Sequence, residues 1–285
     1  MFKRTYATLA LWFFTIVILY FGGIQAGIWL LAVVVFFTQW EFYLLLEKMG
    51  YRPYCKFGLG LGIFFILATY YLSAQENQSV SSFGNELLAI AVTMMSLLII
   101  TKKGFTEKMR SLIPSLFGIL YIPFLLHFLV CLALLFDPAN FLPNTGLLMV
   151  LWVVIVAKFT DVGGLIVGKK WGKTQMAPQI SPRKTWEGTI GGIVLSATVG
   201  TIFVAFFRSQ MPENFSITKS FFYAIPLASL AIVSDLVESA MKRRAKVKDS
   251  GTSIPGIGGW FDLTDSIILT APIAYLIIKY TILKV

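Results

Sequence analysis

Five carboxylates lie in or beside the last four apolar stretches of this 285-residue chain: Asp161, Asp235, Glu238, Asp262 and Asp265. An ionised side chain facing lipid costs about 2.5–3.5 kcal/mol on insertion scales, so the five together would cost on the order of 10 kcal/mol. We therefore expect them to line a polar cavity, where their mutual repulsion favours a bound cation. A polar cluster with a purely structural role is the alternative.

The spacing of these residues places several of them on shared helix faces. In one stretch, polar residues recur at i, i+3, i+4 and i+7: Asp235, Glu238, Ser239 and Lys242. Asp262 and Asp265 are three positions apart and share a face at the start of the last stretch. Mg²⁺ prefers one or two carboxylates plus substrate phosphates. The pattern therefore predicts Mg²⁺ together with a nucleotide or a pyrophosphate.

Two polar segments near these carboxylates combine cations, hydroxyls and glycines. They are residues 169–187, with Ser181, Arg183 and Lys184, and residues 242–262, with Lys242, Arg243, Lys248, Asp249, Gly256 and Gly258. Glycines let backbone N–H groups approach an anion closely, and hydroxyls and cations suit phosphate oxygens. Alone, such a segment is an ordinary basic loop of a membrane protein. Beside the carboxylates it favours phosphate binding.

The composition requires a lipid environment for the helices that carry these groups. Hydrophobic residues make up 57% of the chain and charged residues 13%, and the mean hydropathy is +0.78. A soluble domain of this size needs more charge on its surface. The net charge of +10 lies in short loops between apolar stretches, where it meets anionic headgroups or phosphorylated substrates. We therefore expect no nucleic-acid partner.

Apolar stretches near the length that a bilayer requires recur along the chain. We expect about nine transmembrane helices, near residues 6–23, 26–46, 57–74, 86–101, 114–136, 146–168, 188–207, 219–241 and 264–283, with a tight hairpin at 22–25. Alternate loops carry 19 of the 24 basic residues. The positive-inside rule then places the N-terminus and the long loops in the cytoplasm and the C-terminus outside.

The expected fold is therefore an all-α polytopic membrane protein with two regions. Residues 1–136 contain about five transmembrane helices of nearly uniform apolar character. Residues 137–285 form the catalytic transmembrane region, with cytoplasmic loops at 169–187 and 242–262. No internal repeat of the kind found in many transporters is present in the sequence.

The polar motifs of the second region resemble the phosphatidate cytidylyltransferase (CDP-diacylglycerol synthase) family. They read Ser239-Ala-Met-Lys242-Arg243, Lys248-Asp249-Ser-Gly251, Pro255-Gly256-Ile257-Gly258-Gly259 and Asp262-Leu263-Thr264-Asp265. The segment Ser181–Gly188 is also similar, so the resemblance covers about residues 157–270. Four motifs in this order are far more specific than a single glycine motif.

The resemblance implies that CTP and phosphatidate give CDP-diacylglycerol and pyrophosphate at a Mg²⁺ site facing the cytoplasm, in a multi-pass protein of the cell membrane. It implies metal ligation by Asp235, Asp262 and Asp265, with Lys248 and Asp249 as further catalytic residues. Substrate-binding residues would be Asp161, Ser181, Arg183, Lys184, Ser239, Lys242, Arg243, Gly256 and Gly258. Whether a second cation binds stays open, and a homodimer is the family-level expectation.

Three positions depart from the family pattern. Ile257 replaces a histidine, Leu263 replaces an arginine, and Leu165 stands where an aromatic residue is usual. Lys158 either supplies a compensating cation or pairs with Asp161. The departures leave open another lipid acceptor, such as an ether lipid or a polyprenol. The alternatives are a CTP-dependent polyprenol or phytol kinase and, from another class, a cation transporter.

Overall fold

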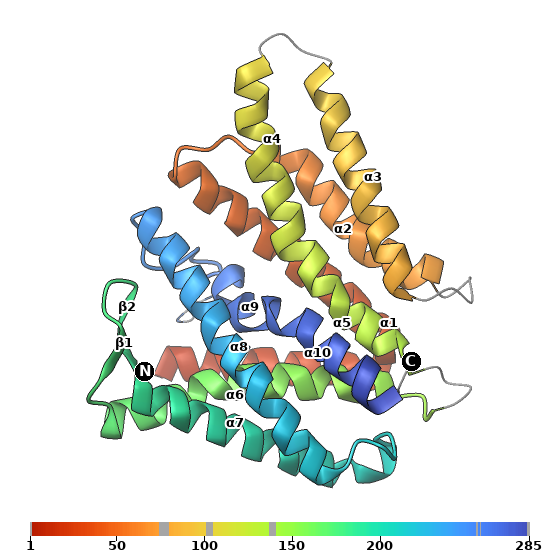
Figure 1. Ribbon diagram of the computed structural model, residues 1–285, viewed down its shortest axis with the longest axis vertical. Coiled ribbons are helices and arrows are strands. Elements are labelled where there is room, and N and C mark those ends of the chain that lie inside the picture. The colour runs from red at the N-terminus through yellow and green to blue at the C-terminus, as the bar shows by residue number, and fades with distance from the viewer. Residues whose placement is uncertain are drawn as a thin grey trace. The chain divides into compact units, whose positions relative to one another are not determined.

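The computed structural model describes residues 2–73, 80–100, 105–136, 141–254, 256 and 258–283 (Figure 1). The helices are α1 (Phe2–Lys48), α2 (Cys55–Ser73), α3 (Val80–Ile100), α4 (Phe105–Ile119), η1 (Leu120–Phe124), α5 (Leu125–Leu134), α6 (Thr145–Trp171), α7 (Trp186–Phe206), η2 (Arg208–Gln210), α8 (Ile217–Arg244), α9 (Trp260–Ile268), α10 (Thr270–Ile278) and η3 (Lys279–Leu283). The strands are β1 (Gln175–Ala177) and β2 (Ser181–Thr185).

Within the described residues, seven helical stretches are long and apolar enough to cross a membrane. They are Ala10–Lys48, Cys55–Leu72, Lys108–Leu134, Thr145–Trp171, Trp186–Phe206, Ile217–Arg244 and Trp260–Leu283. A shorter apolar helix spans Gly84–Leu97. The chain is thus a helical polytopic membrane protein, as its composition predicted.

The chain folds into two compact units that interleave in sequence. The first contains Met1–Leu134 and Arg244–Thr264, and the second contains Leu135–Arg243 and Asp265–Val285. The first unit therefore combines the N-terminal helices with the loop that follows α8.

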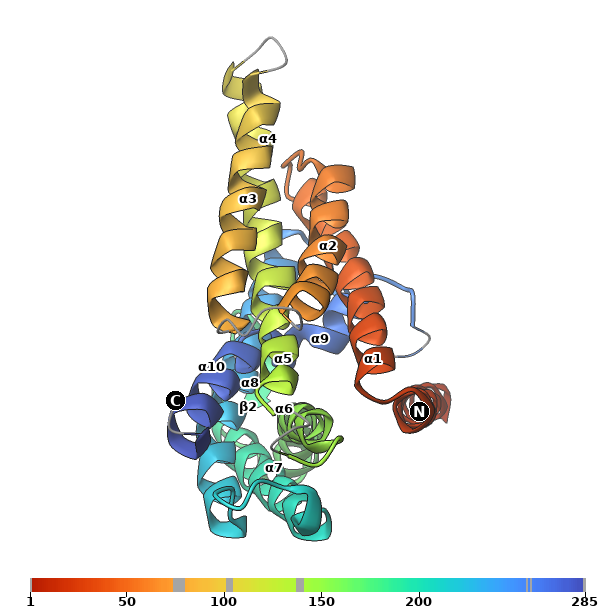
Figure 2. The same ribbon diagram turned by 90° about the vertical axis from the view of Figure 1, so that its right-hand side faces the viewer.

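The first unit begins with a 47-residue helix that is broken once. Gly23 has φ +56° and ψ −147°, which a residue with a Cβ atom rarely adopts, and the helix bends there (Figure 2). The break falls inside the connection predicted at 22–25, where two helices meet at a single non-helical residue. The glycine was correctly read as a break, but it changes the direction of the helix without a connecting loop.

Helices α2, α3, α4 and α5 complete the helical part of the first unit (Figure 1). Apolar side chains join them, with Phe65 and Ala68 of α2 packing on Leu87 of α3. Between α4 and α5 the helix widens into one π-turn at Leu120–Phe124, which contains Pro123. Proline has no N–H to donate to the preceding turn, so a local change of hydrogen-bond register is expected there.

In the second unit, α6 and α7 lie against each other along a stripe of glycines (Figure 1). A Cβ atom on Gly163 would lie 2.9 Å from the Cα atom of Gly192, and one on Gly188 would lie 2.9 Å from the carbonyl oxygen of Gly164. Small residues allow such close approach of helices in a membrane. This contact fixes the end of α6 next to the start of α7.

The strands β1 and β2 form an antiparallel hairpin between α6 and α7, paired at Gln175 with Thr185 and at Ala177 with Ser181. The composition of residues 169–187 predicts only a loop. The hairpin gives this loop a defined shape, and β2 carries Ser181, Arg183 and Lys184.

Candidate active site

Three carboxylates of the second unit converge: two come from α8 and one from α9. One oxygen atom from each of Asp235, Glu238 and Asp265 lies within 4.8 Å of the others. Glu238 is fully buried and Asp265 is 8% exposed. The i, i+3 spacing of Asp235 and Glu238 puts both on the face of α8 that bears this group. The sequence prediction that acids from two helices meet is thus realised for Asp235 and Asp265, with Glu238 as the third member.

Each of these carboxylates has a lysine of its own. Lys184 Nζ lies 2.5 Å from Asp235 Oδ2, and Lys242 Nζ lies 2.5 Å from Glu238 Oε2. Lys158 Nζ lies 3.2 Å from Asp265 Oδ1. The lysines come from β2, α8 and α6, so three different elements deliver the positive charges. We call these six side chains the carboxylate–lysine group.

Hydrogen bonds fix the members of this group from α8 and α9. The backbone N–H of Ser266 donates to Asp265 Oδ1 (2.5 Å), and the Ser234 hydroxyl donates to the carbonyl oxygen of Asp265. Lys158 also donates to Ser266 Oγ (2.7 Å). The hydroxyl of Ser239 lies 3.4 Å from Asp235 Oδ1. The predicted substrate-binding Ser239 therefore contacts a carboxylate of the group.

Of the two roles expected for Lys158, pairing with Asp161 is replaced by pairing with Asp265, and the role of a compensating cation stays a prediction. It pairs with Asp265, more than 100 residues further along the chain, and not with Asp161 on its own helix. Asp161 lies one turn beyond it on α6 and interacts electrostatically with Lys158, Asp235 and Asp265. Asp161 therefore adds negative charge beside the carboxylate–lysine group.

The β-hairpin holds Lys184 in place. Thr185, directly after it, caps α7 by accepting a hydrogen bond from the Gly188 N–H (3.1 Å). Glu187 accepts hydrogen bonds from the N–H groups of Lys173 (3.1 Å) and Thr174 (3.2 Å), so it fixes the start of the hairpin. Arg243, also predicted in the site, donates Nε to the Ile180 carbonyl (3.1 Å). Ser181 is partly exposed and Arg183 is exposed.

The glycine-rich segment belongs to the first unit and is held by Asp262. Asp262 Oδ2 accepts from the N–H of Ser250 (2.9 Å) and the N–H of Gly259 (2.7 Å), and it lies 2.8 Å from the hydroxyl oxygen of Ser250. Gly256 has φ +82° and Gly258 has φ +127°, so both use the left-handed region that favours glycine. We call residues 248–261 the glycine-rich loop.

The other predicted residues of this loop are open to solvent. Lys248 and Asp249 are both exposed. Ile257, the position that departs from the family pattern, lies outside the described residues. Leu263, the second departure, is partly buried in the first turn of α9, and Leu165, the third, is exposed on α6.

Glu41 is a buried acid outside the predicted site residues. This carboxylate of α1 is 3% exposed and accepts hydrogen bonds from Ser250, Ser253 and Phe261. The signal that could have found it is the one used for the other five acids: an ionisable side chain inside an apolar stretch.

The donor set of the carboxylate–lysine group suits a hard divalent cation. All three candidate ligand atoms are carboxylate oxygens, which Mg²⁺ prefers, and they are close enough to share one ion. The three lysines balance their charge in the structure. Asp262, the third predicted metal ligand, belongs to the first unit, and its role as a metal ligand stays a prediction.

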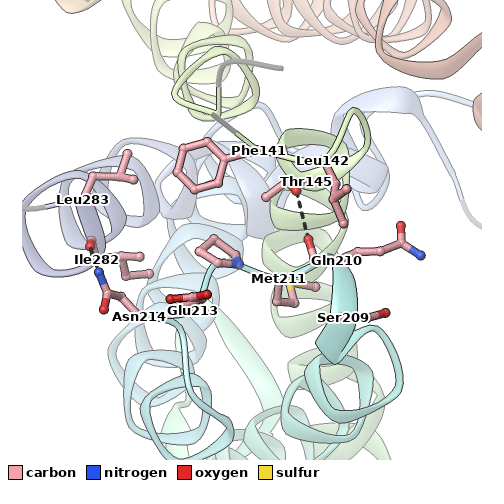
Figure 3. Close-up of a pocket in the computed structure, with 11 residues that line it drawn as sticks. Phe141, Leu142, Thr145, Ser209, Gln210, Met211, Glu213, Asn214, Ile282 and Leu283 are labelled. Carbon is pink, nitrogen blue, oxygen red and sulfur yellow. Dashed lines mark hydrogen bonds between the residues drawn. The ribbon is translucent and has the colours of Figure 1, made fainter. Parts of the chain in front are cut away.

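A cavity of about 420 Å³ lies elsewhere in the second unit (Figure 3). It is bordered by the start of α6, the segment Ser209–Asn214 and the end of η3, where Thr145 donates to the Gln210 carbonyl (2.9 Å). None of the described residues that line it is a predicted site residue. Thr145 precedes Lys158 by more than three helical turns, about 20 Å along α6, so the cavity is separate from the carboxylate–lysine group.

Comparison with known proteins adds an independent observation. The cytidylyltransferase family model matches residues 2–281. Curated relatives named phosphatidate cytidylyltransferase include one from Rickettsia bellii, 35% identical over 194 residues, which are 67% of this chain and 78% of the relative. One from Rickettsia prowazekii is 33% identical over 209 residues, 70% of this chain and 88% of the relative.

A third relative of the same name, from Haemophilus influenzae, is 35% identical over 130 residues, which are 46% of this chain. The match spans 45% of that relative's own length, a little under half.

Proposed function

Because the chain belongs to the cytidylyltransferase family, as its motifs predicted, we propose that it transfers the cytidylyl group of CTP to phosphatidate, giving CDP-diacylglycerol and pyrophosphate. The observation that carries this proposal is the carboxylate–lysine group, whose members lie on membrane-spanning helices and on the hairpin between two of them. The names of the matched relatives support phosphatidate as the acceptor.

In this proposal Asp235 and Asp265, together with Glu238, hold Mg²⁺, and Asp262 is a further ligand. When bound, the ion neutralises charge on the triphosphate and makes the α-phosphorus more electrophilic. Asp235 and Asp265 are the two members of the group that the sequence motifs also assign to the metal. Glu238 is added because its oxygen lies within 4.8 Å of theirs.

The lysines of the group have the second role. With the carboxylates holding a metal ion, the ammonium groups of Lys158, Lys184 and Lys242 would be available to phosphate oxygens of the two substrates. Ionised donors form the stronger hydrogen bonds to phosphate, and lysine is a compact cation suited to it. The same three residues thus keep the buried acids neutralised without substrate and neutralise phosphates with substrate.

The remaining predicted residues position the substrates. Backbone N–H groups near Gly256 and Gly258, with Lys248, Asp249 and Arg243, are proposed to contact CTP. Ser181 and Arg183 contact a phosphate from the hairpin, beside Ser239 and Asp161. An oxygen of the lipid phosphate attacks the α-phosphorus, the bond to the β-phosphate oxygen breaks, and pyrophosphate leaves with that oxygen. Placement and charge neutralisation supply most of the catalysis in such a transfer.

We further propose nine membrane crossings, with the N-terminus and the active site on the cytoplasmic side and the C-terminus outside. Seven long apolar stretches lie within the described residues. Gly23 divides the first into two parts, and the shorter helix Gly84–Leu97 supplies the ninth crossing. The basic loops support the orientation. Localisation in the cell membrane and a homodimer complete the proposal.

Product analysis tests the reaction. The purified protein is incubated with Mg²⁺, phosphatidate and CTP that carries label on either the α- or the γ-phosphate, and a parallel sample lacks Mg²⁺. Entry of the α-label into lipid, release of the γ-label as pyrophosphate, and loss of both without Mg²⁺ are expected. If phosphatidate gives no transfer and another lipid phosphate gives the same pattern, the acceptor is an ether-lipid or polyprenyl phosphate instead. Entry of the γ-label into a lipid alcohol would replace the proposal by a kinase.

A further inference from the structure

Helix α1 carries a buried carboxylate whose partners all lie in the glycine-rich loop and the start of α9. Glu41 Oε1 accepts from the Ser253 hydroxyl (2.7 Å), and Glu41 Oε2 accepts from the Ser250 hydroxyl (2.9 Å) and the Phe261 N–H (3.1 Å). Residues more than 200 positions apart in sequence are joined here, inside one compact unit. We propose that Glu41 is a positioning residue that fixes the shape of the glycine-rich loop, and thereby the binding of CTP.

The contacts of Glu41 are of a kind that holds backbone in place. A buried carboxylate is costly unless its oxygens are hydrogen-bonded, and hydrogen bonds to an ionised acceptor are the strong ones. Two hydroxyls and a backbone N–H satisfy Glu41, and none of the salt bridges among the described residues involves it. The carboxylate is therefore stabilised by hydrogen bonds from the loop itself, so the loop and the carboxylate depend on each other.

The loop is held at both ends. Ser250 lies between Glu41 and Asp262, with its hydroxyl 2.9 Å from the first and 2.8 Å from the second carboxylate. At the other end Phe261 donates to Glu41, and Gly259 donates to Asp262 (2.7 Å). Glu41 and Asp262 therefore both contact the start of the loop at Ser250 and its end at Gly259 and Phe261, on either side of the two left-handed glycines.

Two glycines of the motifs are explained by this arrangement. A Cβ atom on Gly251 would lie 2.8 Å from Glu41 Cδ, and one on Gly259 would lie 2.6 Å from the same atom. Real Cβ atoms do not approach that closely, so both positions must lack a side chain for Glu41 to enter the loop. The glycines of Lys248-Asp249-Ser-Gly251 and of the glycine-rich motif thus leave room for a carboxylate of α1 as well as for backbone to approach an anion.

Neighbours of Glu41 on α1 hold the start of α9 as well. Phe37 stacks on Trp260 with ring centroids 5.2 Å apart, and Phe42 meets Phe261 edge-on at 5.4 Å. Thr38 donates to the Trp260 carbonyl (3.4 Å). One face of α1 therefore supports the loop. The functional part of the chain then includes a helix that lies outside the sequence motifs.

The catalytic consequence rests on the proposed function, since it requires that the glycine-rich loop contacts CTP. The experiment compares Glu41→Leu, which removes all three acceptor contacts, with Glu41→Gln. In Glu41→Gln the amide oxygen can still accept from Ser250 and Phe261, while the amide nitrogen donates to the Ser253 hydroxyl. Glu47→Leu is the matched control, because Glu47 is an exposed acid of the same helix whose described contact is with Cys55 Sγ (3.3 Å).

Two readouts are measured for each variant. Amide hydrogen exchange in detergent reports the order of residues 249–261, and steady-state kinetics give KM for CTP and kcat separately. We expect Glu41→Leu to speed exchange in this peptide and to lower kcat/KM for CTP about 100-fold, mainly through KM. Glu41→Gln should lose about tenfold or less, because two contacts keep an acceptor. Unfolded protein would instead lower kcat with KM unchanged.

Exchange and KM in Glu41→Leu equal to those in Glu47→Leu would overturn the inference. If Glu41→Leu fails to fold, Ser253→Ala replaces it: this change removes one donor, and unchanged exchange in residues 249–261 would again contradict the proposal. A wild-type protein without cytidylyl transfer would instead refute the proposed function, while the exchange result would still test the contacts of Glu41.

Discussion

The two units hold their carboxylates in different ways. In the second unit Asp235, Glu238 and Asp265 each pair with a lysine. In the first unit Glu41 is surrounded by hydroxyls and a backbone N–H. Asp262 likewise accepts from Ser250 and Gly259. The carboxylates are of one chemical type, but their partners differ.

The partners determine what each carboxylate can do during a reaction. A lysine can leave a carboxylate when a metal ion takes its place and can then bind a phosphate, because its flexible side chain carries the charge with it. A backbone N–H cannot move without moving the chain. We therefore interpret the lysine-paired acids as the metal-binding carboxylates and Glu41 as a fixed support of the loop. Asp262 combines the two roles, because it accepts hydrogen bonds from the loop and is also a proposed metal ligand.

The largest expected effect is that of Asp265→Asn. The change keeps the volume of the side chain but removes the charge proposed to hold Mg²⁺, so kcat should fall about 1,000-fold or more. Steady-state cytidylyl transfer measures the loss. Near-normal Mg²⁺-dependent turnover in this variant would show that Asp265 is not a metal ligand.

A matched double variant separates this effect from folding. Asp265→Asn leaves the half-buried Lys158 without its salt bridge, and Lys158→Met with Asp265→Asn removes both charges. Removing one partner of a buried pair is strongly destabilising, whereas removing both is often neutral. The double variant should therefore regain thermal stability and remain inactive.

Asp262→Asn is expected to have the next largest effect. Its amide oxygen can take the place of Oδ2, so Ser250 and Gly259 keep their acceptor and hydrogen exchange in the loop should change little. The proposed metal ligand is lost, so turnover should fall about 100-fold. Slow exchange with turnover within a few-fold of the wild type would show that Asp262 is not a metal ligand and, like Glu41, only supports the loop.

A smaller effect is expected for Lys184→Gln. The variant removes one ammonium group from the carboxylate–lysine group, so KM for CTP should rise about tenfold to 100-fold. Lys170→Gln is the control. This lysine is exposed, and its described contact is with the ring of Trp171, whose centroid lies 4.6 Å from Lys170 Nζ. Equal KM values in the two variants would show that Lys184 serves only as a counter-ion of Asp235.

Much of this organisation could be predicted from sequence because the signals are local. Apolar length gave most of the membrane-spanning helices. The i, i+3 spacing put Asp235 and Glu238 on one face of α8, as the structure confirms. Lys158, Lys184 and the acids they contact are far apart in the chain, so their pairing required the fold.

Two features escaped prediction for physical reasons. The strands β1 and β2 have three and five residues, with Pro182 inside β2, so they show no apolar alternation. An acid inside an apolar stretch marks Glu41 in the sequence, but its role could not be predicted because its partners lie more than 200 residues away.

The most direct test of the difference between the two sets of carboxylates is metal binding measured without turnover. Mn²⁺ substitutes for Mg²⁺, and the fraction that remains free is followed by electron paramagnetic resonance as wild-type protein, Asp265→Asn and Glu41→Gln are added in the presence of CTP. Binding by the wild type and by Glu41→Gln, with loss of binding in Asp265→Asn, is the predicted result. Equal binding by Asp265→Asn and the wild type would contradict the account, because the lysine-paired acids would then not hold the metal.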